Sequence, residues 1–162
     1  MKIKFRTEVY PTDIEIVRKL TAGTGFFNGE EIAIAAELPS EKLEKGNASG
    51  YEFIFLEVDG VTMAYSCYGR IPLTKSSYDL YWIVTDTAYR NKGFGKELLR
   101  KTEQDIMIRG GTALYAETSS RRQYIPTRMF YEHNGYILKA RFEDYYDTED
   151  DLVMYVKRFD LL

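Results

Sequence analysis

The sequence is poor in the residues that cross-link a chain or bind a metal ion. Among its 162 residues there is one cysteine, Cys67, and one histidine, His133. A single cysteine excludes an intramolecular disulfide. No cluster of histidine and cysteine has the spacing of a zinc site. We therefore expect a fold that depends on its own apolar core, and a function that uses no metal ion.

Long apolar runs and an excess of positive charge are also missing. No window approaches the roughly 20 apolar residues that a membrane-spanning helix needs, and the alternating first residues do not have the pattern of a signal peptide. The formal net charge is −3, whereas a nucleic-acid-binding protein needs a basic face. These absences predict a soluble, cytoplasmic protein that binds neither a membrane nor a nucleic acid.

The sequence does have the length of one ordinary domain and an unusual number of tyrosines. We expect residues 1–162 to form a single domain that is large enough to bury a continuous core. The 14 tyrosines outnumber the nine phenylalanines and the one tryptophan. Because a tyrosine is apolar along its ring and polar at its tip, it suits the wall of a binding pocket as well as a core.

The hydrophobic pattern predicts an α/β (α+β) fold. Period-two alternation and a turn at Asp59-Gly60 predict strands, and period-3.6 stripes predict helices. The expected helix from about residue 30 stops or bends near Pro39. The elements are strands at 2–10, 78–85, 112–119, 136–143 and 151–158, a hairpin over 51–70, and helices at 11–23, from about 30, 94–109 and 124–133. This order predicts a mixed, mostly antiparallel sheet of about seven strands flanked by about four helices, with the acidic segment EDYYDTEDD linking the last two strands.

The stretch YRNKGFGKELL, residues 89–99, lies between a strand and a helix. A helix N-terminus offers unpaired backbone N–H groups and a partial positive charge, and glycines let a ligand approach the backbone closely. Arg90, Lys92 and Lys96 crowd this end, where cations disfavour the helix itself. A bound polyanion would explain that arrangement, so the stretch predicts a phosphate-binding site.

Two motifs in the chain resemble those of the GNAT N-acetyltransferase family. The stretch VTDTAYRNKGFGKELL resembles the family's acetyl-CoA-binding motif, and RMFYEHNGY resembles a later helix that carries a tyrosine. The spacing between the two and the expected order of elements are also similar to the family's. The resemblance covers essentially the whole chain, and it implies the GNAT fold and acetyl-CoA as the acyl donor, but no particular acceptor.

The resemblance implies a role for individual residues. Backbone N–H groups from Arg90 to Lys96 would hold the pyrophosphate of coenzyme A, and the strand end at 83–85 would pair with the pantetheine arm. Tyr131 would lie near the thioester sulfur and act as general acid. The expected cofactor-binding residues are Ile83, Val84, Thr85, Arg90, Asn91, Lys92, Gly93, Phe94, Gly95, Lys96 and Tyr131.

Acetyl transfer to an amine also needs a base, because aliphatic amines are mostly protonated at neutral pH. Asp79 is a lone charge in an apolar strand, and burial there would raise its pKa toward the range that suits a base. Glu117, in the next strand, is the second candidate, and a relayed water is a third. The catalytic candidates are therefore Asp79, Glu117 and Tyr131.

The acceptor is less clearly encoded. By resemblance, the segment that contains Phe26, Phe27, Glu30 and Glu31 lines the acceptor pocket. The acidic segment EDYYDTEDD adds carboxylates and the pair Tyr145-Tyr146 on the far side. Aromatic and carboxylate groups suit a cationic amine such as an amino acid, a polyamine or a peptide N-terminus. A homodimer is compatible with the sequence. An alternative function is a non-catalytic acyl-CoA-binding or interaction module with the same fold.

Overall fold

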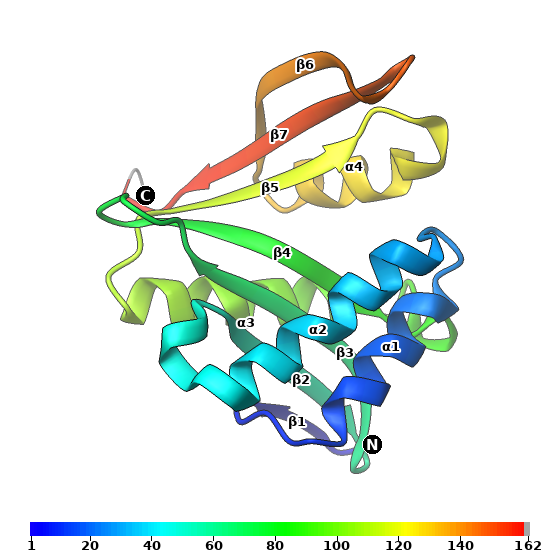
Figure 1. The fold of residues 1–162 in the computed structure, drawn as a ribbon, viewed down its shortest axis with the longest axis vertical. Coiled ribbons are helices and arrows are strands. Elements are labelled where there is room, and N and C mark those ends of the chain that lie inside the picture. The colour runs from blue at the N-terminus through cyan, green and yellow to red at the C-terminus, as the bar shows by residue number, and fades with distance from the viewer. Residues whose placement is uncertain (161–162) are drawn as a thin grey trace. The chain divides into compact units, whose positions relative to one another are not determined.

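The computed structural model describes residues 1–160. Within them lie seven strands and four α-helices in the predicted order (Figure 1). The strands are β1 (Ile3–Arg6), β2 (Glu52–Val58), β3 (Val61–Arg70), β4 (Ser77–Thr85), β5 (Ala113–Ser119), β6 (Ile137–Asp147) and β7 (Asp150–Arg158). The helices are α1 (Asp13–Gly23), α2 (Gly29–Lys45), α3 (Phe94–Ile108) and α4 (Ile125–His133). The strand order β1-β2-β3-β4-β5-β7-β6 confirms the predicted mixed sheet.

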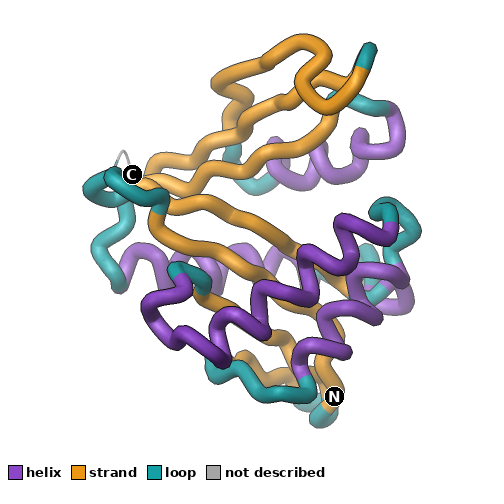
Figure 2. Tube along the Cα trace, viewed as in Figure 1, coloured by secondary structure: helices purple, strands orange, loops and turns teal. Residues whose placement is uncertain are grey.

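The chain divides into two compact units. The first comprises 1–69 and 82–105, and the second comprises 70–81 and 106–162. Strand β4 therefore contributes to both: it belongs to the second unit up to Tyr81 and to the first from Trp82. Figure 2 distinguishes the helices, strands and loops of each unit by colour.

In the first unit, strands β1, β2 and β3 are antiparallel neighbours. Alternation along β3 sends Tyr65 and Cys67 into one core with residues of α1 and α2. The residues between and beyond them face α3, because Ser66 hydrogen-bonds Thr102 at 2.8 Å and the Tyr68 hydroxyl donates to Asp105. Helices thus cover both faces of β3, as period-two geometry requires of a strand apolar on both sides.

In the second unit, β5 is the central strand. It pairs in parallel with the first half of β4 and antiparallel with β7, which in turn pairs antiparallel with β6. Leu114 and Ala116 on β5 are fully buried. Helix α4 lies against β7 through ring contact between Tyr131 and Tyr155.

Element bounds differ from the sequence-based prediction in several places. Helix α2 does not end at Pro39 but continues to Lys45. Proline removes one backbone hydrogen bond, but Pro39 and Leu38 are buried, and the helix starts from a capping box in which Asn28 and Glu31 satisfy each other's backbone N–H groups. Packing and capping outweigh the lost hydrogen bond.

The acidic segment EDYYDTEDD is not a long loop. Strand β6 runs to Asp147 and β7 begins at Asp150, so only two residues connect them. The carboxylates accept backbone hydrogen bonds: Asp151 from the Asp144 N–H and Asp144 from the Glu149 N–H, both at 2.9 Å. Local side-chain acceptors therefore stabilise a tight, irregular hairpin that the charge run did not predict.

Within residues 1–160, no helix combines the length and the apolar character that a membrane span would need.

Candidate cofactor and catalytic site

The predicted phosphate site is a turn that opens α3. Strand β4 ends at Thr85, and a short 3-10 turn follows, in which the Asp86 carboxylate accepts from the Ala88 N–H at 2.8 Å. Asn91 and Gly93 then adopt positive φ angles of 62° and 82°. These two left-handed residues reverse the chain so that α3 starts at once, at Phe94. The side-chain-free Gly93 takes this conformation at little cost.

The turn leaves several backbone donors at the start of α3. The Glu97 N–H donates to the Gly93 carbonyl at 3.1 Å, which is the first bond of the helix ladder. The N–H groups of residues 93–96 precede that bond and have no acceptor within the helix. A Cβ added at Gly93 would meet nothing within 4 Å, so the space above this backbone is open. These donors and the positive end of α3 fit a diphosphate.

The side chains of the turn have different tasks. Phe94 is only 4% exposed and packs on Tyr89, with ring centroids 5.5 Å apart, so its ring anchors the turn in the core. The Arg90 guanidinium donates to the Thr24 carbonyl at 3.4 Å and lies 5.2 Å from the Phe26 ring. The Lys92 ammonium lies 5.2 Å from the centre of the Tyr89 ring.

The end of β4 has one buried and two partly exposed residues. Val84 joins the core of the first unit, whereas Ile83 and Thr85, one position to either side, are partly exposed. Trp82 stacks edge-on against Phe27, with ring centroids 4.9 Å apart. All of these residues and the α3 turn belong to the first unit.

The two candidate bases lie on adjacent strands of the second unit. Asp79 on β4 is opposite Tyr115 on β5, and Glu117 follows two residues later on the same side of β5. Burial raises the pKa of Asp79 from 3.8 to about 6, and the negative charge of Glu117 adds to the rise. Glu117 itself is exposed. The expected environment of Asp79, a partly desolvated carboxylate, is therefore present.

Tyr131 is held among aromatic rings on α4. Its ring centroid lies 5.7 Å from Phe130, 5.6 Å from Tyr136 and 5.7 Å from Tyr155, and the residue is 5% exposed. Burial raises the pKa of Tyr131 well above its usual value. The phenol therefore keeps its proton at neutral pH and is available there as a hydrogen-bond donor.

The expected acceptor residues fall into two groups. Phe26, Phe27, Glu30 and Glu31 lie in the first unit at the start of α2, where the Glu31 carboxylate accepts the Asn28 N–H at 3.1 Å as half of the capping box. Tyr145 lies in the second unit on β6 and is 61% exposed.

Tyr146, the neighbour of Tyr145, belongs to the same aromatic pair of the acidic segment. Its ring packs edge-on against Tyr145, with centroids 5.1 Å apart. Burial, followed by the charge of Glu117, raises its pKa to about 12. Tyr146 is therefore electrostatically coupled to a candidate base. The adjacent tyrosines were the available signal, but the sequence did not show which of them faces the carboxylates.

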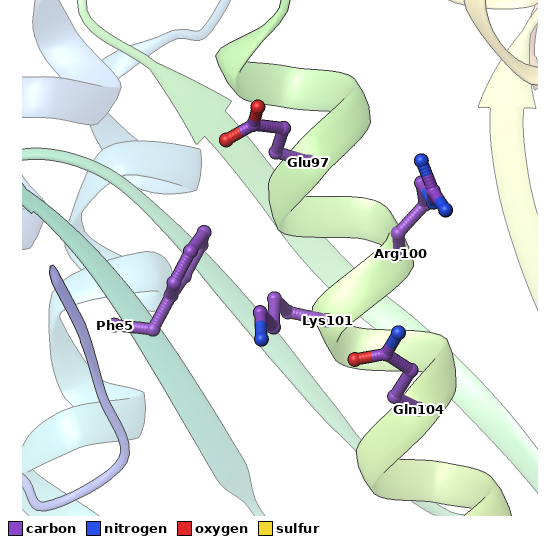
Figure 3. Close-up of a pocket in the computed structure, with 5 residues that line it drawn as sticks. All are labelled: Phe5, Glu97, Arg100, Lys101 and Gln104. Carbon is purple, nitrogen blue, oxygen red and sulfur yellow. The ribbon is translucent and has the colours of Figure 1, made fainter. Parts of the chain in front are cut away.

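An open hollow of about 230 Å³ lies elsewhere on the first unit, between β1 and α3. Figure 3 shows Phe5 opposite the α3 side chains. The Lys101 ammonium lies 5.2 Å from the centre of the Phe5 ring. Glu97, Arg100 and Gln104 complete the lining. The hollow contains none of the predicted site residues. Across residues 1–160, no cluster of histidine, cysteine and carboxylate side chains is arranged to hold a metal ion.

The comparisons with known proteins agree on one family. The family model described as "Acetyltransferase (GNAT) domain" matches residues 49–138, more than half of the chain. A crystal structure of a candidate GNAT-family acetyltransferase from Desulfovibrio desulfuricans is similar with a TM-score of 0.96 and 40% identity, covering 98% of this chain and 99% of that one. No curated protein matches the sequence.

More distant structures share the fold. An aminoglycoside 6'-N-acetyltransferase complexed with coenzyme A has a TM-score of 0.75 at 15% identity, covering 98% of this chain and 97% of that one. The ribosomal-protein-S18-alanine N-acetyltransferase from Escherichia coli has a TM-score of 0.76 at 17% identity, with 98% and 94% covered. At these identities the likeness concerns the fold alone.

Proposed function

Because the chain belongs to the GNAT acetyltransferase family, we propose that it transfers an acetyl group from acetyl-CoA to a primary amine of a small molecule or peptide. The observation that carries the proposal is the turn before α3, where Asn91 and Gly93 at positive φ leave the N–H groups of residues 93–96 without helical acceptors. We further propose that residues 1–162 work as one catalytic domain in the cytoplasm, as a monomer or homodimer.

The turn would bind the diphosphate of coenzyme A. The N–H groups from Asn91 to Lys96 would donate to the phosphate oxygens, and Lys92 and Lys96 would add charge. Arg90 would steady the turn through its contacts with Thr24 and Phe26. The backbone of residues 83–85 would hold the pantetheine arm as an added strand does.

Asp79 would prepare the acceptor by removing a proton from its ammonium group. With a pKa of about 6, Asp79 is mostly ionised at neutral pH and is still close enough to neutrality to exchange protons readily. Glu117 would assist by its charge, or replace Asp79 as the base through a water. When bound, acetyl-CoA supplies an acyl group activated as a thioester.

Tyr131 would supply a proton to the departing sulfur. Its buried phenol keeps that proton throughout the physiological pH range. The retained phenol, together with a carboxylate of raised pKa, supports an enzyme over a module that only binds acyl-CoA.

The acceptor is proposed to be cationic. In the second unit, the carboxylates of Asp79 and Glu117 supply negative charge. Tyr145 and Tyr146 supply aromatic rings, and Tyr146 senses the charge of Glu117. In the first unit, the segment before and at the start of α2 has aromatic and carboxylate side chains of its own, at Phe26, Phe27, Glu30 and Glu31. The names of the distant structures, an aminoglycoside acetyltransferase and a protein-alanine acetyltransferase, describe amine acceptors in those proteins.

A thiol-release assay with acetyl-CoA and a panel of amines tests the proposal. Polyamines, amino acids, aminoglycosides and peptide N-termini would be compared, and each product identified by a mass gain of one acetyl group. We expect at least one cationic amine to be acetylated at its nitrogen. Binding of acetyl-CoA without turnover of any amine would instead favour the non-catalytic alternative.

A further inference from the structure

Helix α4 is too short to hold Tyr131 in place by itself. It has nine residues, and isolated helices of that length are marginal in water. Tertiary bonds must therefore fix its position. Near its start, Arg128 donates from one nitrogen to the Ser119 carbonyl at 2.7 Å and to the Arg121 carbonyl at 2.9 Å. These bonds tie the helix to the end of β5.

A second anchor comes from Tyr155 on β7. Its ring centroid lies 5.7 Å from that of Tyr131, with the planes inclined at 31°. Its hydroxyl donates to the Glu132 carboxylate at 2.9 Å. One side chain thus packs against Tyr131 and also bonds to the next residue of the same helix.

Tyr155 is itself firmly placed. It is 1% exposed and pairs with Ala116 on β5 and Leu138 on β6, so it lies in the middle of three strands. Burial and the bond to Glu132 raise its pKa to about 12. It therefore remains a hydrogen-bond donor at every pH at which the enzyme would be assayed.

We propose that Tyr155 is a positioning residue for Tyr131: its ring sets the tilt of the Tyr131 ring, and its bond to Glu132 prevents α4 from rotating. This inference rests on the proposed function, in which Tyr131 is the acid. Tyr155 touches no reacting atom in this account and acts only through α4. Because a small misplacement of a catalytic group slows the reaction, loss of the contact between Tyr155 and α4 should lower kcat.

The test is a double-mutant cycle, measured as acetyl transfer to whichever amine of the thiol-release panel is acetylated fastest by the wild type. Tyr155→Phe keeps the ring and deletes the hydroxyl, and the freed Glu132 is exposed to water. We expect kcat to fall about tenfold, with little change in KM for acetyl-CoA. In the Tyr131→Phe background the same substitution should cause no further loss, because residues that act as one unit are not additive.

Two control variants separate positioning from a general loss of stability. Tyr65→Phe removes another buried tyrosine hydroxyl, which hydrogen-bonds Thr21 at 2.6 Å in the first unit, and it should leave kcat unchanged. Glu132→Gln keeps an acceptor for Tyr155 and should retain near wild-type kcat, whereas Glu132→Ala should behave like Tyr155→Phe. Circular dichroism of each variant checks that it is folded.

The outcomes distinguish the inference from the function on which it rests. An unchanged kcat in Tyr155→Phe, or an equal fall in both backgrounds, would overturn the positioning role and leave Tyr131 as the acid. Wild-type kcat in Tyr131→Phe would overturn both. A fall in Tyr155→Phe that vanishes in the Tyr131→Phe background supports the proposal.

Discussion

Asp79 illustrates how one residue's surroundings can suit it to proton transfer. It is a carboxylate in an apolar strand, partly buried, with Glu117 nearby on β5. Desolvation and a like charge both oppose ionisation, and together they raise its pKa from 3.8 to about 6.

Asp79→Asn should abolish the rise of kcat/KM with pH that is expected near pH 6 in the wild type. The rate at pH 7.5 should fall by about 10²–10⁴-fold, the usual contribution of a general base. Glu117→Gln serves as the comparison: it removes a nearby negative charge and should move the same rise to lower pH. A rise near pH 6 that persists in Asp79→Asn would transfer the role to Glu117 or a water.

Asp79→Asn should lower the rate but raise the stability of the fold. Because the folded pKa lies above the unfolded one, the contribution of Asp79 to stability is full below about pH 4 and is lost as pH rises through about 6. Asp79→Asn should therefore gain stability relative to wild type between pH 4 and pH 8. A shift of this size corresponds to about 3 kcal/mol, which solvent screening at this partly exposed site reduces to about 1 kcal/mol. Urea unfolding at the two pH values measures the gain, and a difference that does not change with pH would contradict it.

At the scale of elements, the two ends of α3 have the same backbone requirement and different proposed tasks. Gly93 precedes the helix with φ of 82°, and Gly110 follows it with φ of 87°. A Cβ at either position would meet nothing within 4 Å. Only the N-terminal turn presents N–H donors to an anion. Substituting Gly93 and Gly110 in turn therefore distinguishes the effect of backbone strain from the effect on cofactor binding.

Gly93→Val should weaken acetyl-CoA binding at least about tenfold, because valine would leave the left-handed conformation and redirect the N–H groups of the turn. Gly110→Val is the matched control, because Gly110 follows the other end of α3 with a similar positive φ. Both variants should lose about 1–2 kcal/mol of stability, but only Gly93→Val should lose affinity in a calorimetric titration. Equal affinities in the two variants would contradict the assignment of the turn.

Three other elements are joined by a buried ion network. Arg6, at the end of β1, donates two hydrogen bonds to the Asp13 carboxylate of α1, at 2.8 and 2.9 Å. It donates a third to the Glu57 carboxylate of β2, at 2.7 Å. Asp13 is fully buried and Arg6 nearly so. Removing one partner of a buried pair leaves a charge without compensation, so the network should be essential to the first unit.

Asp13→Ala should lower the free energy of unfolding by about 3–5 kcal/mol. The control is Glu15→Ala, which breaks the exposed 3.2 Å pair with Arg18 on the same helix and should cost less than about 1 kcal/mol. Urea unfolding followed by circular dichroism gives both values. If the two variants lost similar free energies of unfolding, the buried network would contribute no more to stability than an exposed ion pair.

At the scale of the whole molecule, the order of elements could be predicted because local signals were consistent. The Asp59-Gly60 turn, the apolar strand 78–85 and the Gly110 and Gly135 helix ends all act within a few residues. Packing that involves distant residues could not be predicted. Pro39 stays within a helix because it is buried. Arg90 contacts Thr24, which is far away in the sequence. Glu31 takes part in a capping box, which neither requires nor excludes a role at the acceptor site.

The turn before α3 was predictable from sequence for the same reason, since a glycine turn and a helix start are local features. Its role in binding coenzyme A stays a prediction. The surroundings of Asp79 and Tyr131 required the strand register and ring contacts that only the structure supplies. The choice of amine depends on side-chain positions that no local sequence signal encodes, so the acceptor was the least predictable part of the proposed site.

The central claim is that the amides opening α3 bind the diphosphate of coenzyme A. Calorimetric titration of the wild-type protein with acetyl-CoA and, separately, with S-acetylpantetheine tests it most directly, because the second compound lacks the diphosphate. We expect one acetyl-CoA per chain, with a dissociation constant between roughly 1 μM and 1 mM, and binding of S-acetylpantetheine at least about tenfold weaker. Equal affinity for the two compounds, or no heat with acetyl-CoA, would contradict the account.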